Sequence, residues 1–197
     1  MRIADVLAPR FCVVFLRLVR LGSFPACWRQ SNVTLIPKGP LSSSVANYRQ
    51  ISKTSVLSKV FERLVSVGIG RFMESSGVLP TTQFAYRKCL GTCDALFCVS
   101  YTLQSTYESG QEARIVQIDF SAAFSRVKNQ GIIYKLCSEG IAGSMLSLLT
   151  QFLSNRSQYV MVDGCWSKLV IIVSGGPQSS VLNPSLFLLY TSELFSI

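Results

Sequence analysis

Histidine is absent from this sequence of 197 residues, and acidic residues are few. Ten Asp and Glu stand against 19 Lys and Arg. Only four of the acids are aspartates, and no two of them are adjacent in the chain. The lack of histidine removes the commonest base for a serine or cysteine nucleophile. The sequence therefore does not favour hydrolases that depend on such a pair.

Zinc-binding cysteine patterns are also missing. The seven cysteines are an odd number and contain no Cys-x-x-Cys pair. Cys89, Cys93 and Cys98 are spaced unlike zinc ligands, and no histidine can complete a site. We expect the cysteines to be buried, reduced thiols.

No uncharged apolar run reaches the length of a membrane span. The best candidate, 11–16, is followed closely by Arg17 and Arg20. The N-terminus is a poor signal peptide, because Asp5 and Arg10 precede a short apolar run. We expect an intracellular protein, in the nucleus or the cytoplasm. A membrane protein, suggested by the mean hydropathy of +0.37, is the weakest interpretation.

Positive charge is abundant and unevenly placed. The chain is 49% hydrophobic, so it can bury the core of one domain or of one lobe of a larger domain. Residues 1–88 hold 13 Lys and Arg against three acids, a net charge of +10. Residues 89–197 hold six Lys and Arg against seven acids, a net charge of −1. The asymmetry indicates an N-terminal part that faces a polyanion, or else a basic surface that serves solubility.

Asp119 stands at the end of a predicted strand. Ile115, Val116 and Ile118 favour a strand, and residues 120–124 favour a turn into a helix. A carboxylate at the end of a buried strand can hold a cation at a sheet edge that is open to substrate. The alternative is a solvated or helix-capping aspartate.

Hydrophobic periodicity and turn residues predict helices mixed with short strands. The expected helices are 3–21, 54–75, 92–109, 130–138, 143–153 and 182–195. The expected strands are 32–36 and a hairpin, 158–162 with 168–173, around Asp163-Gly164, and 41–46 is expected to be a serine-rich loop. In helix 54–75 the predicted inward residues are Leu57, Val60, Phe61, Leu64 and Phe72, with Glu62 on the polar face. In helix 92–109 they are Leu96, Val99, Leu103 and Tyr107.

Seven segments in this order resemble the reverse transcriptases of LINE-type (non-LTR) retrotransposons, most closely the jockey-like elements. They are LIPKG (35–39), NYRQIS (47–52), SKVFERL (58–64), QFAYRKCLGTCDAL (83–96), DFSAAF (119–124), FLSNRSQYV (152–160) and SGGPQSSVLNP (174–184). The resemblance implies an α/β (α+β) fold with the fingers and a partial palm of a right-hand polymerase, and a small antiparallel sheet. We expect a helical lead-in over 1–30 and the polymerase part over 31–197.

The resemblance also implies a nucleotide site. Asp119 corresponds to a catalytic carboxylate that binds Mg²⁺, and Phe124 to an aromatic that packs under the sugar and selects deoxynucleotides. Lys38 and Arg49 correspond to fingers cations that grip the triphosphate, for which the planar fork of arginine is well suited. Gln178 corresponds to a residue that contacts the nucleotide and the template base. Without the resemblance, a core phenylalanine and a basic surface loop remain open.

Arg87 and Lys88 correspond to residues that contact the template strand or shape the nucleotide pocket. Contacts to a nucleic-acid backbone give affinity without sequence preference. The implied partners are an RNA template, a DNA primer and deoxynucleoside triphosphates.

Several positions depart from the family pattern. Residues 119–125 read DFSAAFS where the family pattern reads D-F-S-K-A-F-D, so Ser125 replaces an acid. Residues 174–184 read SGGPQSSVLNP where the family pattern reads S-G-V-P-Q-G-S-V-L-G-P. Gly176 therefore replaces valine, and Ser179 and Asn183 replace glycines. Elsewhere in the chain, Gln50 replaces a proline and Cys89 replaces a small residue. The change at Ser179 matters most, because a Cβ penalises positive φ and close backbone approach.

The family's paired aspartates and thumb are expected downstream of this sequence. Two-metal catalysis needs more carboxylates than Asp119 supplies, so we expect Mg²⁺ to bind weakly and this chain alone to be inactive. Three functions remain open: a reverse transcriptase domain fragment, a non-catalytic basic nucleic-acid-binding remnant, and a translated fossil without function.

Overall fold

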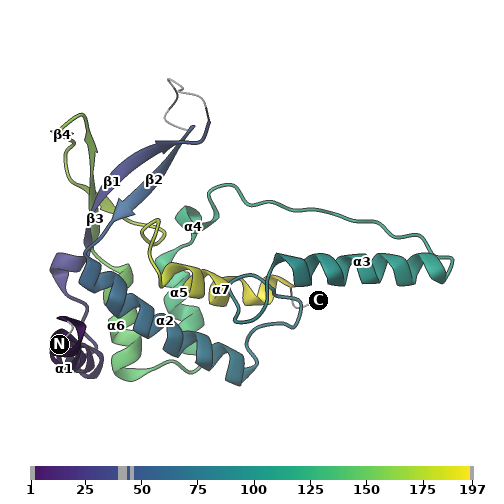
Figure 1. The fold of residues 1–197 in the computed structure, drawn as a ribbon, viewed down its shortest axis with the longest axis horizontal. Coiled ribbons are helices and arrows are strands. Elements are labelled where there is room, and N and C mark those ends of the chain that lie inside the picture. The colour runs from purple at the N-terminus through teal and green to yellow at the C-terminus, as the bar shows by residue number, and fades with distance from the viewer. Residues whose placement is uncertain (1–2, 40–43, 45–46, 196–197) are drawn as a thin grey trace.

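The structure, a computed structural model, describes residues 3–39, 44 and 47–195, and these form a mixed α and β fold as predicted (Figure 1). The helices are α1 (Ile3–Leu21), α2 (Val56–Ser76), α3 (Thr92–Glu108), α4 (Ala123–Arg126), α5 (Asn129–Ser138), α6 (Gly143–Leu153) and α7 (Asn183–Thr191), with 3-10 helices η1 (Ala26–Trp28) and η3 (Ser192–Phe195). The strands are β1 (Gln30–Pro37), β2 (Tyr48–Lys53), β3 (Arg156–Val162), β4 (Cys165–Trp166) and β5 (Val170–Ile172). Most predicted elements are confirmed. The expected loop 41–46 lies, except for Ser44, outside the described residues.

The sheet is mixed, whereas the sequence predicted an antiparallel one. Its strand order is β2-β1-β3-β4, and β5 also pairs with β3. β1 pairs antiparallel with β2 and parallel with β3, so that Val33 lies between Ser52 and Val160. β2 is the edge strand, and its outer side is therefore open to a contact from another part of the chain.

The predicted hairpin around Asp163-Gly164 is confirmed. Both residues have positive φ, 49° and 77°, as a type I′ turn requires. Beyond this turn, Met161 pairs with Trp166. The ring of Trp166 meets that of Tyr159 edge to face, at a centroid distance of 4.7 Å.

α1 confirms the helix predicted near the N-terminus, and Gly22 directly follows its last residue. A Cβ at Gly22 would lie 2.6 Å from the carbonyl oxygen of Ser144, and its φ of +61° favours glycine for a second reason. Arg10, Arg17 and Arg20 are exposed. None of the described helices combines the length and the apolar character that crossing a membrane requires.

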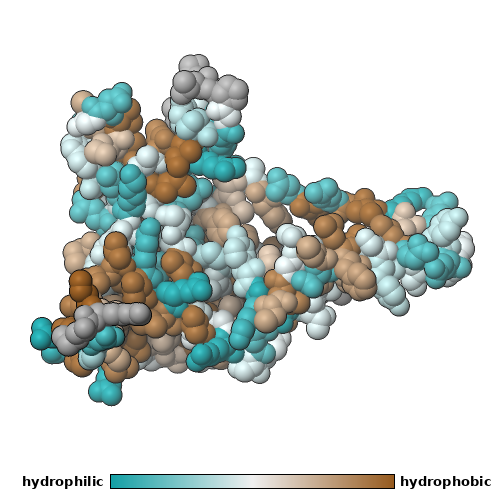
Figure 2. Space-filling model, in the orientation of Figure 1, coloured by the Kyte–Doolittle hydropathy of each residue, from teal (hydrophilic) through white to brown (hydrophobic). Residues whose placement is uncertain are grey.

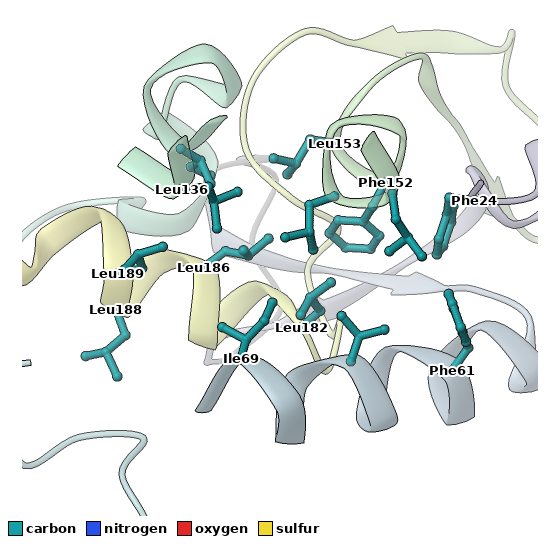
Figure 3. Packing of buried hydrophobic residues seen from close by; sticks show 14 of the residues in the cluster. Phe24, Phe61, Ile69, Leu136, Phe152, Leu153, Leu182, Leu186, Leu188 and Leu189 are labelled. Carbon is teal, nitrogen blue, oxygen red and sulfur yellow. The ribbon is translucent and has the colours of Figure 1, made fainter. Parts of the chain in front are cut away.

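The core lies where α2, α6 and α7 meet, with α1 and α5 at its sides. Figure 3 shows Phe24, Phe61, Phe152, Leu182 and Leu186 converging in this space, and each is at most 1% exposed. The ring of Phe24 meets that of Phe152 edge to face, 5.2 Å between centroids. The core therefore joins the N-terminal third of the chain to its C-terminal end.

The buried face of α2 differs from the predicted one. Leu57, Val60 and Leu64 are 37–57% exposed, while the residues that α2 buries are Ser58, Phe61, Glu62, Val65, Ile69 and Met73. The prediction failed because α2 carries apolar residues on most of its circumference, so periodicity alone does not select one face. Glu62 is fully buried and was expected on the polar face.

α3 buries none of its residues, so its predicted inward face is wrong. Leu96 is 66% exposed and Tyr107 is 81% exposed. Figure 1 shows α3 pointing away from the core, and Figure 2 shows apolar side chains along this arm. A periodic apolar stripe is buried only when another element packs against it, and no described element covers this one.

The strand predicted before Asp119 is absent from the described structure. Residues 111–120 are all exposed and run back along α3 without strand pairing (Figure 1). Ile115, Val116 and Ile118 are 68–82% exposed. A strand needs a neighbour for its backbone hydrogen bonds, and no described strand lies beside this segment.

The cysteines are free thiols, but the prediction that they are buried is wrong. All seven are exposed. Three of them lie on or beside α3, which packs against no other element: Cys89, Cys93 and Cys98.

Leu186→Ala is expected to lower the free energy of unfolding by about 2–5 kcal/mol, because Leu186 is 0% exposed in the core. The matched control is Leu96→Ala on α3, where the side chain is 66% exposed and the change should stay within about 0.5 kcal/mol. Urea unfolding of both variants measures the difference, and equal effects would contradict the placement of the core.

Candidate functional site

The loop 174–183, which precedes α7, joins three separate parts of the molecule. It contacts the segment after Asp119, the outer edge of β2 and the buried side of α2. Gln178 lies in the middle of this loop. Gln178 is therefore the centre of the candidate site.

On one side the loop is fixed to α4. Gly175 N–H donates to Val127 O at 2.9 Å, and Ser174 Oγ donates to Ser125 O at 3.2 Å. A Cβ at Gly175 would lie 2.6 Å from Phe124 O, and the φ of Gly175 is +72°. Glycine is therefore required here, because the two backbones touch.

On the other side the loop occupies the outer edge of β2. Ser52 N–H donates to Gln178 O at 3.0 Å, and Ser179 Oγ donates to Ser52 O at 2.5 Å. The loop thus satisfies polar groups of the edge strand that no neighbouring strand covers. It also brings the exposed Gln178 next to the strand that carries Arg49.

A third contact joins the loop to Glu62 on α2. Its carboxyl group accepts a hydrogen bond from Ser58 Oγ at 2.8 Å, from Ser180 Oγ at 2.6 Å and from Val181 N at 3.1 Å. Ser180 Oγ accepts in turn from the backbone N–H of Leu182. Glu62 is thus the buried end of a network that leads to the start of α7.

Asp119 lies at the mouth of a cavity of about 340 Å³ beside α7 and η3. The cavity is lined by Asp119, Phe120, Ser121, Ala123, Arg126, Val127, Phe187, Tyr190, Thr191 and Leu194. Asp119 is exposed, and Arg126 brings a positive charge to the same cavity. The carboxyl group is accessible from solvent, and the strand that was expected to carry it is missing from the described structure.

The donor set around Asp119 does not fit a two-metal centre. Mg²⁺ prefers an octahedron of oxygen ligands, and two-metal catalysis needs several shared carboxylates. Asp119 is the one acid that lines this cavity. Within the described ranges no cluster of three or more His, Cys, Asp or Glu side chains is placed to hold a metal ion.

Phe124 is half-buried in a group of three aromatic rings. Its ring lies 4.5 Å from that of Phe187 on α7 and 6.3 Å from that of Tyr86. The ring is contacted by two other rings and remains partly accessible, so it is not a fully enclosed core phenylalanine.

Lys38 and Arg49 lie near the outer end of the β1–β2 pair. Arg49 pairs with Ile36, and Lys38 N–H donates to Asn47 O at 2.8 Å. Both residues are exposed. The register thus places two cations on neighbouring chains, on the strand pair whose outer edge holds Gln178.

Arg87 is engaged within the chain, whereas Lys88 is exposed. Arg87 Nη2 donates to Glu74 Oε2 at 2.6 Å, and Arg87 Nη1 donates to the carbonyl oxygens of Pro80 and Gln83. The hydrogen bonds between Arg87 and Glu74 lower the pKa of Glu74 and raise the pKa of Arg87. The ion pair is therefore present at neutral pH and is lost as the pH falls through the lowered pKa of Glu74. In this conformation Arg87 shapes the loop that presents Lys88.

The positions at which this chain departs from the family pattern differ in backbone geometry. Ser179 has a φ of +86° and Cys89 a φ of +61°, so both occupy backbone conformations that favour glycine. Asn183 is different, because its side chain fills space: a Cβ at Gly176 would lie 2.2 Å from Asn183 Oδ1. The two departures at positions 176 and 183 are therefore in contact and compensate each other in volume.

Sequence reasoning missed two residues that hold the site together. Glu62 was expected on a polar face, and only the spacing of four residues to Ser58 indicated a partner. Arg156, 1% exposed, lies over the ring of Phe152 and donates to Phe152 O at 2.9 Å. Burial lowers the pKa of Arg156 to about 10, and Glu62 opposes this shift. A buried charge can be inferred from sequence only when its partners are known.

Ser179→Gly should be more stable than Ser179→Ala by about 1–2 kcal/mol. Both variants lose the hydroxyl group that donates to Ser52, but only glycine relieves the positive φ. Urea unfolding measures the difference. Ser185, inside α7, is the control position. There the alanine variant should be more stable than the glycine variant, because alanine is the better helix former. Equal stability of the two variants at position 179 would contradict the strained backbone.

Gly176→Val should destabilise the chain by about 1–3 kcal/mol, because the new side chain collides with Asn183. In the double variant Gly176→Val/Asn183→Gly the collision is absent. The double-mutant cycle should therefore show a favourable coupling of at least about 1 kcal/mol. Additive effects in thermal or urea unfolding would show that the two positions are independent.

Comparison with known proteins places this sequence in one family. The model of the reverse transcriptase (RNA-dependent DNA polymerase) family matches residues 36–197. A probable RNA-directed DNA polymerase from transposon X-element of Drosophila melanogaster is 33% identical over 183 residues, which cover 92% of this chain and 20% of that protein. RNA-directed DNA polymerases from the mobile element jockey are 29% identical in Drosophila melanogaster and 31% in Drosophila funebris, with the same coverage. The chain spans about a fifth of the length of these curated relatives. It belongs to the reverse transcriptase family, with relatives among the non-LTR retrotransposons.

Proposed function

We propose that this chain forms the fingers and part of the palm of an RNA-directed DNA polymerase, with 1–30 as a helical lead-in and 31–197 as the polymerase part. The observation that supports this most is the loop 174–183. It connects the segment that carries Asp119 and Phe124 with the strand that carries Arg49. One loop thus links residues that are far apart in the sequence, which supports a shared site for a nucleoside triphosphate.

In this proposal each part of the nucleotide has its own residues. Lys38 and Arg49 attract the triphosphate, and the guanidinium group can bind two phosphate oxygens at once. Phe124, fixed between Tyr86 and Phe187, supports the sugar. Gln178 is exposed and has the donors and acceptors needed to contact a base.

The template contacts are proposed for the loop that ends at Lys88. Lys88 is exposed and can reach a phosphate without losing a partner ion. A template contact by Arg87 requires its guanidinium group to share or leave Glu74. The net charge of +10 on residues 1–88 supports an RNA template and a DNA primer as partners.

Asp119 is the residue proposed to bind Mg²⁺. In a complete polymerase the metal ions would stabilise the charge of the transferred phosphate. The described residues supply one carboxylate at this position, which does not fit the two-metal requirement. We therefore derive no catalytic step for this chain alone, and we propose that its own contribution is to bind and orient substrates.

A non-catalytic nucleic-acid-binding remnant is the second candidate function. The same uneven charge supports it, since affinity for a polyanion needs exposed cations and no catalytic carboxylate. The two candidates differ in one respect: only a polymerase adds nucleotides to a primer.

The chain should bind a primed RNA template with an affinity that falls steeply as salt is added. Lys88→Ala should reduce the slope of log K against log salt by about 0.7–0.9, the loss of about one phosphate contact. Fluorescence anisotropy at several salt concentrations measures this. Lys168→Ala, an exposed cation in the neutral half, is the charge-matched control and should leave the slope nearly unchanged.

A flat salt dependence would contradict both candidate functions. Primer extension with Mg²⁺ or Mn²⁺ separates them, and we expect none from this chain alone. Nucleotide incorporation that Asp119→Ala abolishes would show that the chain is itself a polymerase.

A further inference from the structure

Glu62 is a carboxylic acid in the middle of the core. It is 0% exposed on α2, between Phe61 and the buried side of the loop 174–183. Among the described residues, no ion pair includes Glu62. Burying a carboxyl group is unfavourable unless its hydrogen bonds are satisfied, and an apolar residue would pack here at lower cost. The position therefore calls for a role that an apolar residue cannot fulfil.

The hydrogen bonds of Glu62 identify that role. Ser58 satisfies one carboxyl oxygen within α2, and Ser180 and Val181 satisfy the other from the loop. Ser180 Oγ accepts from the backbone N–H of Leu182 at 3.1 Å and of Asn183 at 3.2 Å. The carboxyl group thus fixes the loop at its only buried serine and, through that serine, the first turn of α7.

The same loop is bound to β2 just before Ser180. Ser179 donates to Ser52 O, and Ser52 N–H donates to Gln178 O. Gln178 and Ser179 are exposed, whereas Ser180 is buried, so the chain turns inward at this point. An anchor at Ser180–Val181 therefore sets the position and direction of the peptide of Gln178, two residues away.

We propose that Glu62 is a positioning residue, which holds Ser180 and Val181 so that Gln178 lies against β2 at Ser52, on the strand that also carries Arg49. Glu62 does not contact substrate in this proposal and acts only through the loop. Its relevance to nucleotide binding rests on the proposed function of Gln178, whereas its effect on the loop does not.

The Ser52 amide proton reports on this arrangement. Its acceptor is Gln178 O, and it bonds neither Glu62 nor Ser180. In Glu62→Ala its hydrogen exchange, measured by NMR relative to the core amide of Leu149, should become about tenfold faster or more. A role confined to local packing would change the Ser52 and Leu149 amides equally, and that result would overturn the proposal.

Conservative substitution gives the second test. In Glu62→Gln the amide oxygen can accept from Ser180 and Val181, while its NH₂ group donates to the Ser58 hydroxyl, which then acts as the acceptor. The Ser52 exchange rate should therefore stay within about threefold of the native rate. Rates as fast in Glu62→Gln as in Glu62→Ala would contradict the positioning role.

Ser180→Ala is used in case Glu62→Ala does not fold, because it removes the hydroxyl bond to Glu62 from the loop and leaves the carboxyl group and its bond from Val181 in place. It should also speed the exchange of Ser52 relative to Leu149 by about tenfold. The matched control is Ser66→Ala, which removes a hydroxyl contact of 2.8 Å between α2 and Ser185 on α7 but leaves the loop intact. Ser66→Ala should not change this ratio, and a native ratio in Ser180→Ala would overturn the proposal.

Nucleotide affinity separates this inference from the proposed function. The dissociation constant of a deoxynucleoside triphosphate, measured with the primed template present, should rise about tenfold in Glu62→Ala and Ser180→Ala but not in Ser66→Ala. If the native chain binds no nucleotide while the Ser52 amide responds as expected, the proposed function fails and the positioning role stands. If nucleotide binds and neither variant changes its affinity or the Ser52 amide, the positioning role fails and the proposed function stands.

Discussion

The arrangement of the candidate site depends on the hydrogen bonds of one buried carboxyl group. Glu62 accepts from Ser58 within its own helix and from Ser180 and Val181, which lie 118 and 119 residues away in the sequence. They bring the loop before α7 onto α2, and the loop then closes the edge of β2. Because buried polar groups are unfavourable unless every partner is in place, such a network favours a single conformation over several similar ones. The loop that carries Gln178 is therefore held from inside the core rather than from the surface.

Local sequence signals predicted most of the elements and failed where burial depends on a distant partner. The helix near the N-terminus, α5, α6 and the Asp163-Gly164 hairpin follow from periodicity and turn chemistry, which act over a few residues. The buried face of α2 does not, because apolar residues lie on most of the circumference of this helix and its contacts with distant parts of the chain, including that of Glu62 with Ser180, decide which side is buried. The strand before Asp119 failed for the same reason, since a strand forms only beside another strand.

The candidate site was predicted from family motifs, and the structure adds how its parts are joined. Ser179 illustrates the physical content of such a motif. Its φ of +86° explains why glycine is the family's residue there, and its hydroxyl group recovers part of the loss by donating to Ser52. Gly176 and Asn183 show that two departures from a motif can be one change in packing. Neither relation can be read from the sequence, because both depend on which atoms meet.

α3 and residues 111–120 lie outside the core, yet this stretch leads directly to Asp119. Substitutions there remove almost no buried contact, so they escape the stability threshold that limits changes in the core. The stretch that leads to Asp119 can consequently accept substitutions without unfolding the core, so a stable fold in a variant of this chain says little about the state of its candidate site.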